Sequence, residues 1–108
     1  MSYDDECNSD GNVLYDRLKL ELCLIERHMK MLKLIMDDGP LGIIKLSEIT
    51  DFPQHKVRYS LRVLEEEGLI RPSPRGATVT DKTYEFMIDF KEFLGEMERK
   101  IEELKKTL

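Results

Sequence analysis

The stretch DFPQHKVRYSLRVLEEEGLIRPSPRGATVTD, residues 51–81, decides the fold of this 108-residue chain. Its first half predicts a helix over residues 53–67, followed by Gly68, which can take the left-handed conformation that ends a helix. Apolar residues recur in this helix at i, i+4 and i+7, so they share one buried face: Val57, Leu61 and Leu64. The stretch therefore begins with a short amphipathic helix.

The second half of the stretch has the pattern of a β-hairpin. Two short extended runs, LIRPS and ATVTD, bracket the turn sequence SPRG. Pro72 and Pro74 cannot donate a backbone hydrogen bond to a neighbouring strand, so both strands are expected to be edge strands. A small, exposed hairpin is predicted directly after the helix.

The polar face of the predicted helix is unevenly charged. Basic residues gather toward its start, whereas three acids, Glu65 to Glu67, crowd its end. The whole chain has a formal net charge of −5, but residues 1–12 hold four acids and no base, so the other 96 residues carry 17 bases against 18 acids. Because the body is nearly neutral, local clustering decides what it can bind. The outward residues near the helix start are Gln54, His55, Lys56, Arg58, Tyr59 and Arg62.

Upstream, a long helix is expected over residues 13–36, because apolar residues recur on two of its sides. A surface helix of a small domain needs only one apolar stripe, so the second stripe predicts contact with a partner chain. Pro40 cannot continue the helix. Residues 41–43 are expected to form a short strand, followed by a two-turn helix with Leu46 and Ile49 facing the core.

Downstream, helix returns from about Asp81 to Leu108. A helix of about 27 residues extends about 40 Å, more than so small a domain can cover, so a second copy is expected to pack against it. The flanking charges give no clear code, so parallel and antiparallel pairing both stay open. Apolar residues step alternately by three and four, the spacing of a coiled-coil seam: Met87, Phe90, Leu94, Met97, Ile101, Leu104 and Leu108.

The order helix, short strand, helix, tight turn, helix, hairpin, helix resembles a winged helix-turn-helix. Residues 39–82 look like the DNA-binding domain of archaeal and bacterial winged-helix transcriptional regulators, and HKVRYSLRVLEEEGLI is the most specific part. In that family the recognition helix ends in an L-x-x-L-E-x-x-G-L-I pattern. The residues that match it here are Leu61, Leu64, Glu65, Gly68, Leu69 and Ile70.

The resemblance implies a mainly α fold with a three-helix core, a β-hairpin wing and long flanking helices. We divide the chain into an acidic disordered tail (1–12), a winged helix-turn-helix domain that includes the long first helix (13–82), and a C-terminal coiled-coil dimerisation helix (83–108). The resemblance also implies a homodimeric, sequence-specific regulator of transcription. The predicted dimer-interface residues are Leu18, Leu22, Ile25, Met29, Leu94, Met97, Ile101 and Leu104.

The partner expected from the charged face is double-stranded DNA. A major groove admits one helix, in which arginine pairs with guanine, glutamine with adenine, and lysine with phosphate. The hairpin is expected to contact the flanking backbone or minor groove. The predicted DNA-binding residues are Gln54, His55, Lys56, Arg58, Tyr59, Arg62, Arg71, Ser73 and Arg75.

Other interpretations of these residues remain open. The basic face can be a merely solvated surface, with Glu65 or Glu66 pairing with Arg62 at helical spacing. His55 is either a contact or a spectator, and Tyr59 either touches a phosphate or packs on a neighbouring side chain. For the whole protein the alternative is a winged-helix adaptor that binds other proteins and not DNA, which the sequence pI of about 5.1 favours.

Several function classes are not expected. There is no run of about 18 apolar residues and the N-terminus is acidic, so neither a membrane span nor a secretory signal is predicted, and the location expected is cytoplasmic. Cys7 and Cys23 form no C-x-x-C pattern, so we expect free thiols and no zinc site. His28 has no ligand partner at metal spacing and is expected at a surface or an interface. No catalytic motif, cofactor site or small-molecule effector site is evident, so an enzyme is not expected.

Overall fold

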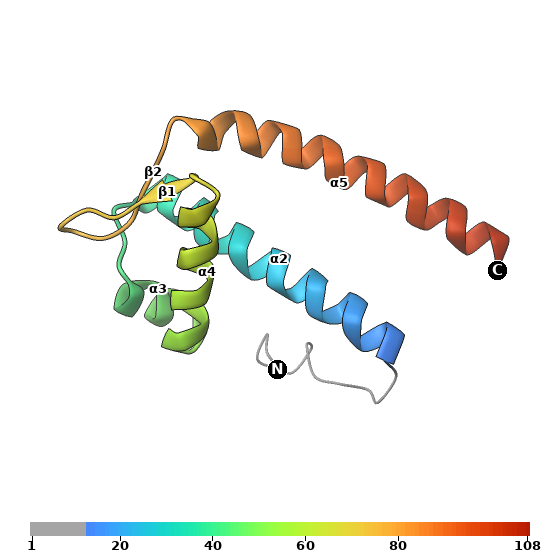
Figure 1. The fold of residues 1–108 in the computed structure, drawn as a ribbon, viewed down its shortest axis with the longest axis horizontal. Coiled ribbons are helices and arrows are strands. Elements are labelled where there is room, and N and C mark those ends of the chain that lie inside the picture. The colour runs from blue at the N-terminus through green and yellow to red at the C-terminus, as the bar shows by residue number, and fades with distance from the viewer. Residues whose placement is uncertain (1–12) are drawn as a thin grey trace.

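The computed structural model describes residues 13–108, which form helices joined by short connections and one β-hairpin (Figure 1). The predicted acidic tail, residues 1–12, lies outside the described residues. The order of elements agrees with the predicted order, except that no strand stands between the first two helices. In chain order the elements are α2 (Val13–Asp38), α3 (Ile43–Thr50), α4 (Gln54–Glu66), β1 (Ile70–Arg71), β2 (Thr78–Val79) and α5 (Lys82–Thr107).

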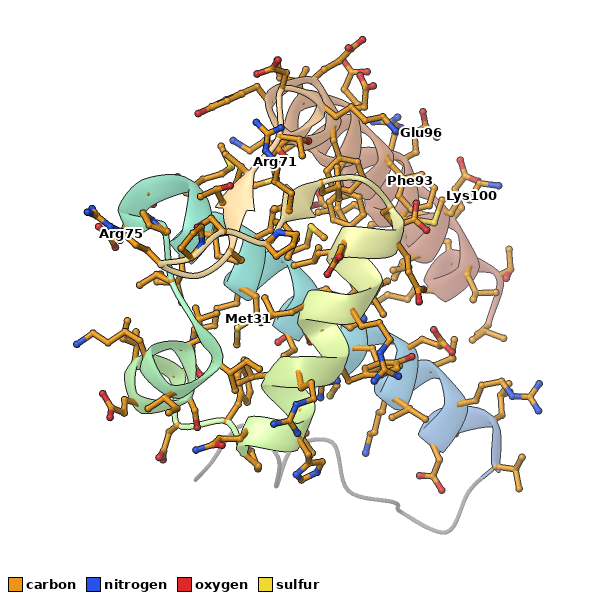
Figure 2. All side chains as sticks on the ribbon, turned by 60° about the vertical axis from the view of Figure 1, so that its left-hand side comes forward. Met31, Arg71, Arg75, Phe93, Glu96 and Lys100 are labelled. Atoms are coloured by element: carbon orange, nitrogen blue, oxygen red, sulfur yellow. The ribbon has the colours of Figure 1, made fainter. Side chains whose placement is uncertain are left out.

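The core lies where the C-terminal half of α2, α3, α4 and the hairpin meet. Met31 of α2 is fully buried at its centre (Figure 2). Met87 and Phe86, near the start of α5, pack against the edge of this core. The buried apolar cluster is Met31, Leu32, Ile35, Leu41, Leu46, Phe52, Val57, Leu64, Leu69 and Ile70.

A tight turn joins α3 to α4 and fixes how the two helices cross. Asp51 ends α3 with a left-handed backbone, φ 66°. The hydroxyl of Ser47 donates a 2.6 Å hydrogen bond to the carbonyl of Phe52, whose ring is buried in the core. Pro53 then precedes the first turn of α4. The buried ring of Phe52 and several hydrogen bonds within the turn therefore hold the start of α4.

The buried face of α4 differs at one position from the prediction. Val57 and Leu64 are buried as expected, but Leu61 is only half-buried, and the third fully buried residue is Ser60. Ser60 lies three residues after Val57 and four before Leu64, so it occupies the same helix face. The spacing of apolar residues cannot predict that a serine lies on the buried face. Its hydroxyl is satisfied by two side chains of α2.

The hairpin pairs β1 with β2 in antiparallel register, with Ile70 opposite Val79. The short strand predicted over residues 41–43 is wrong in extent: Leu41 forms a single bridge to Ala77, and Ile43 already begins α3. Gly76 explains how the chain reaches this bridge. Its φ is 125°, and a Cβ at this position would lie 2.5 Å from the backbone of Leu41.

The N-terminal half of α2 and most of α5 extend away from this core on the same side of the molecule (Figure 1). α5 is held at its beginning, where Thr83 is fully buried and its hydroxyl donates a 2.6 Å hydrogen bond to the carbonyl of Leu69. Farther along, apolar side chains of both helices are exposed: Leu18 and Leu22 on α2, and Leu94, Ile101 and Leu104 on α5.

Candidate nucleic-acid interface

Two arginines form the centre of the candidate interface. Arg58 and Arg62 lie on α4, and both side chains are exposed. Neither guanidinium forms an ion pair with another residue in the described part of the chain. The alternative pairing of Arg62 with Glu65 or Glu66 is therefore absent from the described residues. Both cations remain available to a ligand.

Helix geometry separates the predicted contact residues of α4 into two sides. At 3.6 residues per turn, His55, Arg58 and Arg62 fall within about 60° of one another on the side away from the core. Lys56 lies about 160° around the helix from Arg58 and is half-buried. Gln54 is exposed and borders the same groove as Arg58. Lys56 is thus the α4 residue least suited to act together with the arginines.

Tyr59 packs against α2, although 46 % of its surface remains exposed. The guanidinium carbon of Arg27 lies 5.9 Å from the Tyr59 ring centroid, within cation–π range. The ring of His28 lies 5.8 Å from the same ring, tilted by 45°. Of the two roles considered for Tyr59, packing on a neighbouring side chain is present. Its exposed edge still borders the outward face of α4.

Beneath Tyr59, a polar cluster joins α2 to α4. The Nε of the nearly buried Arg27 donates a 2.8 Å hydrogen bond to Ser60, and His28 Nδ1 lies 2.8 Å from the same oxygen. Burial lowers the pKa of His28 below its ordinary value of 6.5, and the charge of Arg27 lowers it further. His28, expected at a surface or an interface, is half-buried between two helices of one chain.

The hairpin places its two arginines apart. Arg75 lies at the loop end, whereas Arg71 lies on β1, and both are exposed (Figure 2). Ser73 Oγ donates to the carbonyl of Gly76 and accepts the backbone N–H of Arg75 at 3.3 Å. The Ser73 hydroxyl proton is thus used within the loop. Ser73 shapes the loop that presents Arg75, and its oxygen keeps acceptor capacity only.

A groove of about 410 Å³ connects the helix to the wing. From α4 it is bordered by Arg58, Arg62 and Glu65, and from the hairpin by Pro72 and Ser73. The helix and the hairpin therefore present one continuous surface. Glu65, one of the three acids that crowd the end of α4, belongs to that surface too. Because its carboxylate is negatively charged, Glu65 would repel a DNA phosphate at this edge of the groove.

A second groove, of about 540 Å³, lies between α3 and the start of α4. Lys45 and Ile44 of α3 border it together with Gln54 and Arg58. Lys45 is exposed and was not among the predicted contact residues. The sequence contained a signal for its exposure: Lys45 directly precedes Leu46, which was expected to face the core, so the Lys45 side chain points about 100° around the two-turn helix from the core side. Only the crossing of α3 and α4 places it beside Arg58.

Three expectations about other chemistry meet different outcomes. No group of three or more His, Cys, Asp or Glu side chains within residues 13–108 is arranged to hold a metal ion. None of the described helices is long and apolar enough to cross a membrane. Cys23 is disulfide-bonded in the structure, so the expectation of a free thiol was wrong for this residue. Cys7 lies outside the described residues.

The fold and the exposed basic face define a winged helix-turn-helix protein. Residues 26–71, from the second half of α2 through β1, match the model of the family described as bacterial regulatory protein, arsR family. The match confirms the resemblance to winged helix-turn-helix transcriptional regulators and supports a DNA-binding regulator of transcription. No curated protein matches the chain.

Proposed function

We propose that this protein is a homodimeric, sequence-specific regulator of transcription that inserts α4 into the major groove and rests its hairpin on the flanking backbone. The observation that carries the proposal is the exposed, unpaired state of Arg58 and Arg62, which border one groove together with the hairpin. An arginine without an internal partner can form a bidentate pair with the O6 and N7 of guanine.

The remaining contacts follow from position on this surface. Gln54 is placed to read adenine from the start of α4, and Lys45 to neutralise a phosphate beside it. Arg75 at the loop end, and Arg71 farther back on β1, are placed for backbone or minor-groove phosphates. The helix reads sequence, whereas the hairpin and α3 fix the register of the protein on the duplex.

Dimerisation is proposed through the apolar faces that the core leaves uncovered. Leu18 is 63 % exposed and Ile101 is 57 % exposed, and the helices that carry them extend from the core on the same side (Figure 1). Burying apolar surface stabilises by about 25 cal/mol per Å², so several such side chains supply a substantial driving force. A two-fold pair of this kind presents two copies of α4, with half-sites about 34 Å apart.

Within this proposal the chain has two functional parts. Residues 13–82 bind DNA, and residues 83–108 form the dimerisation helix, assisted by the first half of α2. Met29 and Ile25 are half-buried, and Met29 already packs on the core of its own chain, so the outer residues Leu18 and Leu22 carry more of the α2 contact.

The proposal is tested by a mobility-shift selection from a genomic fragment library with purified full-length protein. Arg58→Ala and Arg62→Ala are each expected to lower the affinity for the selected fragment by about tenfold or more, because a bidentate base contact contributes roughly 1–3 kcal/mol. Arg75→Ala is expected to lower the affinity for all fragments similarly. It should also reduce the slope of log affinity against log salt concentration by about one.

The matched control is Arg99→Ala, which removes the same exposed side chain from α5, outside both grooves. It is expected to bind like the wild type. Unchanged binding by all three test variants would remove the assignment.

The alternative is a protein-binding adaptor, and Glu65 is the observation that favours it. This acid borders the same groove as the two arginines, and the chain carries a net charge of −5. An adaptor would select no fragment in the same assay, at low or moderate salt. Selection of a discrete fragment whose retention depends on Arg58 and Arg62 excludes it.

A further inference from the structure

The polar cluster between α2 and α4 has no place in the DNA contacts proposed above. Ser60 is fully buried, and Arg27 is 8 % exposed. Taking a guanidinium out of water is costly, and an apolar residue of similar volume often stabilises a core equally well. A buried arginine that contacts the recognition helix is therefore better explained by the geometry it imposes than by the stability it adds.

The chemistry of the donor fixes the direction of the first hydrogen bond, whereas the tautomer of His28 decides the direction of the second. Arg27 Nε can only donate, so Ser60 Oγ accepts that hydrogen bond at 2.8 Å. Ser60 donates its hydroxyl to His28 Nδ1, also at 2.8 Å, when the imidazole is neutral with its proton on Nε2, a state that the lowered pKa of His28 favours. With either tautomer, Ser60 Oγ joins two side chains of α2 to α4.

Two consecutive residues of α4 are thereby held by two consecutive residues of α2. Ser60 is held by hydrogen bonds, while Tyr59 is flanked by the same Arg27 and His28 at 5.9 and 5.8 Å. The other buried contacts of α4, through Val57 and Leu64, are apolar, and apolar contacts have no preferred bond direction that would fix the rotation of the helix. The cluster therefore supplies hydrogen bonds, which depend on orientation, on this face of the helix.

Rotation of α4 about its axis is what such a contact restrains. A helix with side chains has a radius of about 5–6 Å, so a rotation of about 10° moves side-chain ends by roughly 1 Å. Donor and acceptor in a hydrogen bond are separated by only about 2.7–3.2 Å, so a shift of this size breaks a bidentate base contact. Phosphate attraction tolerates it, because Coulomb energy falls slowly with distance.

We propose that Arg27 and His28 are positioning residues of the recognition helix, which hold α4 in one rotational setting through Ser60 and Tyr59 and thereby determine its sequence specificity. This inference rests on the proposed function. It assigns specificity partly to α2, a helix outside the DNA contacts proposed above, and it predicts a loss of discrimination without loss of non-specific binding.

The test variant is Ser60→Ala, which removes the hydroxyl that both α2 side chains contact. The matched control is Thr83→Val, which removes another fully buried hydroxyl hydrogen bond, between α5 and the carbonyl of Leu69, beyond the C-terminal end of α4. Affinity is measured for the fragment selected by the wild type and for a scrambled fragment of equal length, with thermal unfolding recorded for each protein.

Ser60→Ala is expected to lower affinity for the selected fragment by about tenfold and affinity for the scrambled fragment by less than about twofold. Thr83→Val is expected to keep the wild-type ratio of affinity for the selected fragment to affinity for the scrambled fragment, at a loss of stability comparable to that of Ser60→Ala. Ser60→Thr retains the hydroxyl and is expected to restore the ratio, even where its added methyl group lowers the unfolding temperature.

Equal ratios in Ser60→Ala and the wild type would overturn the positioning role alone, provided the wild type selects a fragment. A ratio that falls equally in Ser60→Ala and Thr83→Val would also overturn it, since the effect would then be general destabilisation. Failure of the wild type to select any fragment would overturn the proposed function together with this inference.

Discussion

At the scale of residues, His28 shows how a half-buried titratable group links folding to pH. The Nδ1 of its imidazole lies 2.8 Å from Ser60 Oγ, and both burial and the neighbouring Arg27 disfavour the imidazolium form. The pKa of His28 in the folded chain is therefore below 6.5, its value in the unfolded chain. Between the two values the unfolded state binds more protons than the folded state.

Stability is accordingly expected to be lost as the pH falls from 6.5 through the folded-state pKa of His28. The measurement is urea unfolding of the wild type and His28→Gln at several pH values between about 7.5 and 5. The free energy of unfolding of the wild type should fall relative to that of the variant. His55→Gln, in which His28 remains, should keep the loss. Parallel curves for the wild type and His28→Gln would contradict this explanation.

At the scale of elements, the hairpin depends on a backbone conformation that its loop must reach. Gly76 has a φ of 125°, and its donor and acceptor groups close the loop with Ser73 while the chain passes close to Leu41. Leu41 and Ala77 exchange backbone hydrogen bonds of 3.1 and 2.8 Å. The hairpin is thereby fixed to the segment that precedes α3.

Gly76→Ala is expected to destabilise the protein by about 2 kcal/mol or more, because alanine is strained at this φ. Its Cβ would also lie 2.5 Å from the Leu41 backbone, which cannot yield as a side chain can. Gly42→Ala is the control: a Cβ there meets nothing within 4 Å, so a change below about 1 kcal/mol is expected. Chemical denaturation measures both. Equal stability of the two variants would contradict this explanation, because it would show that the hairpin backbone shifts to accept a Cβ at residue 76.

At the scale of the whole molecule, the described chain has more apolar surface than its own core covers. Figure 2 shows Phe93, Glu96 and Lys100 along one side of α5, where the apolar face gives way to charge. Phe93 remains 47 % exposed and Leu104 59 % exposed. Exposed apolar side chains repeated along two projecting helices support the dimer interface proposed above.

Leu104→Glu is expected to convert the dimer into a folded monomer, because it places a charge in the proposed seam without touching the core. Lys106→Glu changes the charge by more but lies on the opposite side of α5, so it should remain dimeric. Light scattering after size exclusion gives the mass, and circular dichroism checks the helices. A monomeric wild type, or a dimeric Leu104→Glu protein, would contradict the proposed interface.

The amino-acid sequence by itself determined the order of the helices and the hairpin, and most of the residues exposed near the start of α4. Helix and hairpin patterns depend on spacing between near neighbours, and charged side chains such as Arg58 are exposed because burial is costly. Only tertiary structure decided that Ser60 is buried, that His28 and Arg27 meet it, and that Lys45 and Glu65 border the arginine grooves. These contacts join residues on different elements or across a helix face, so their existence depends on how α2, α3, α4 and the hairpin cross, which no local spacing specifies.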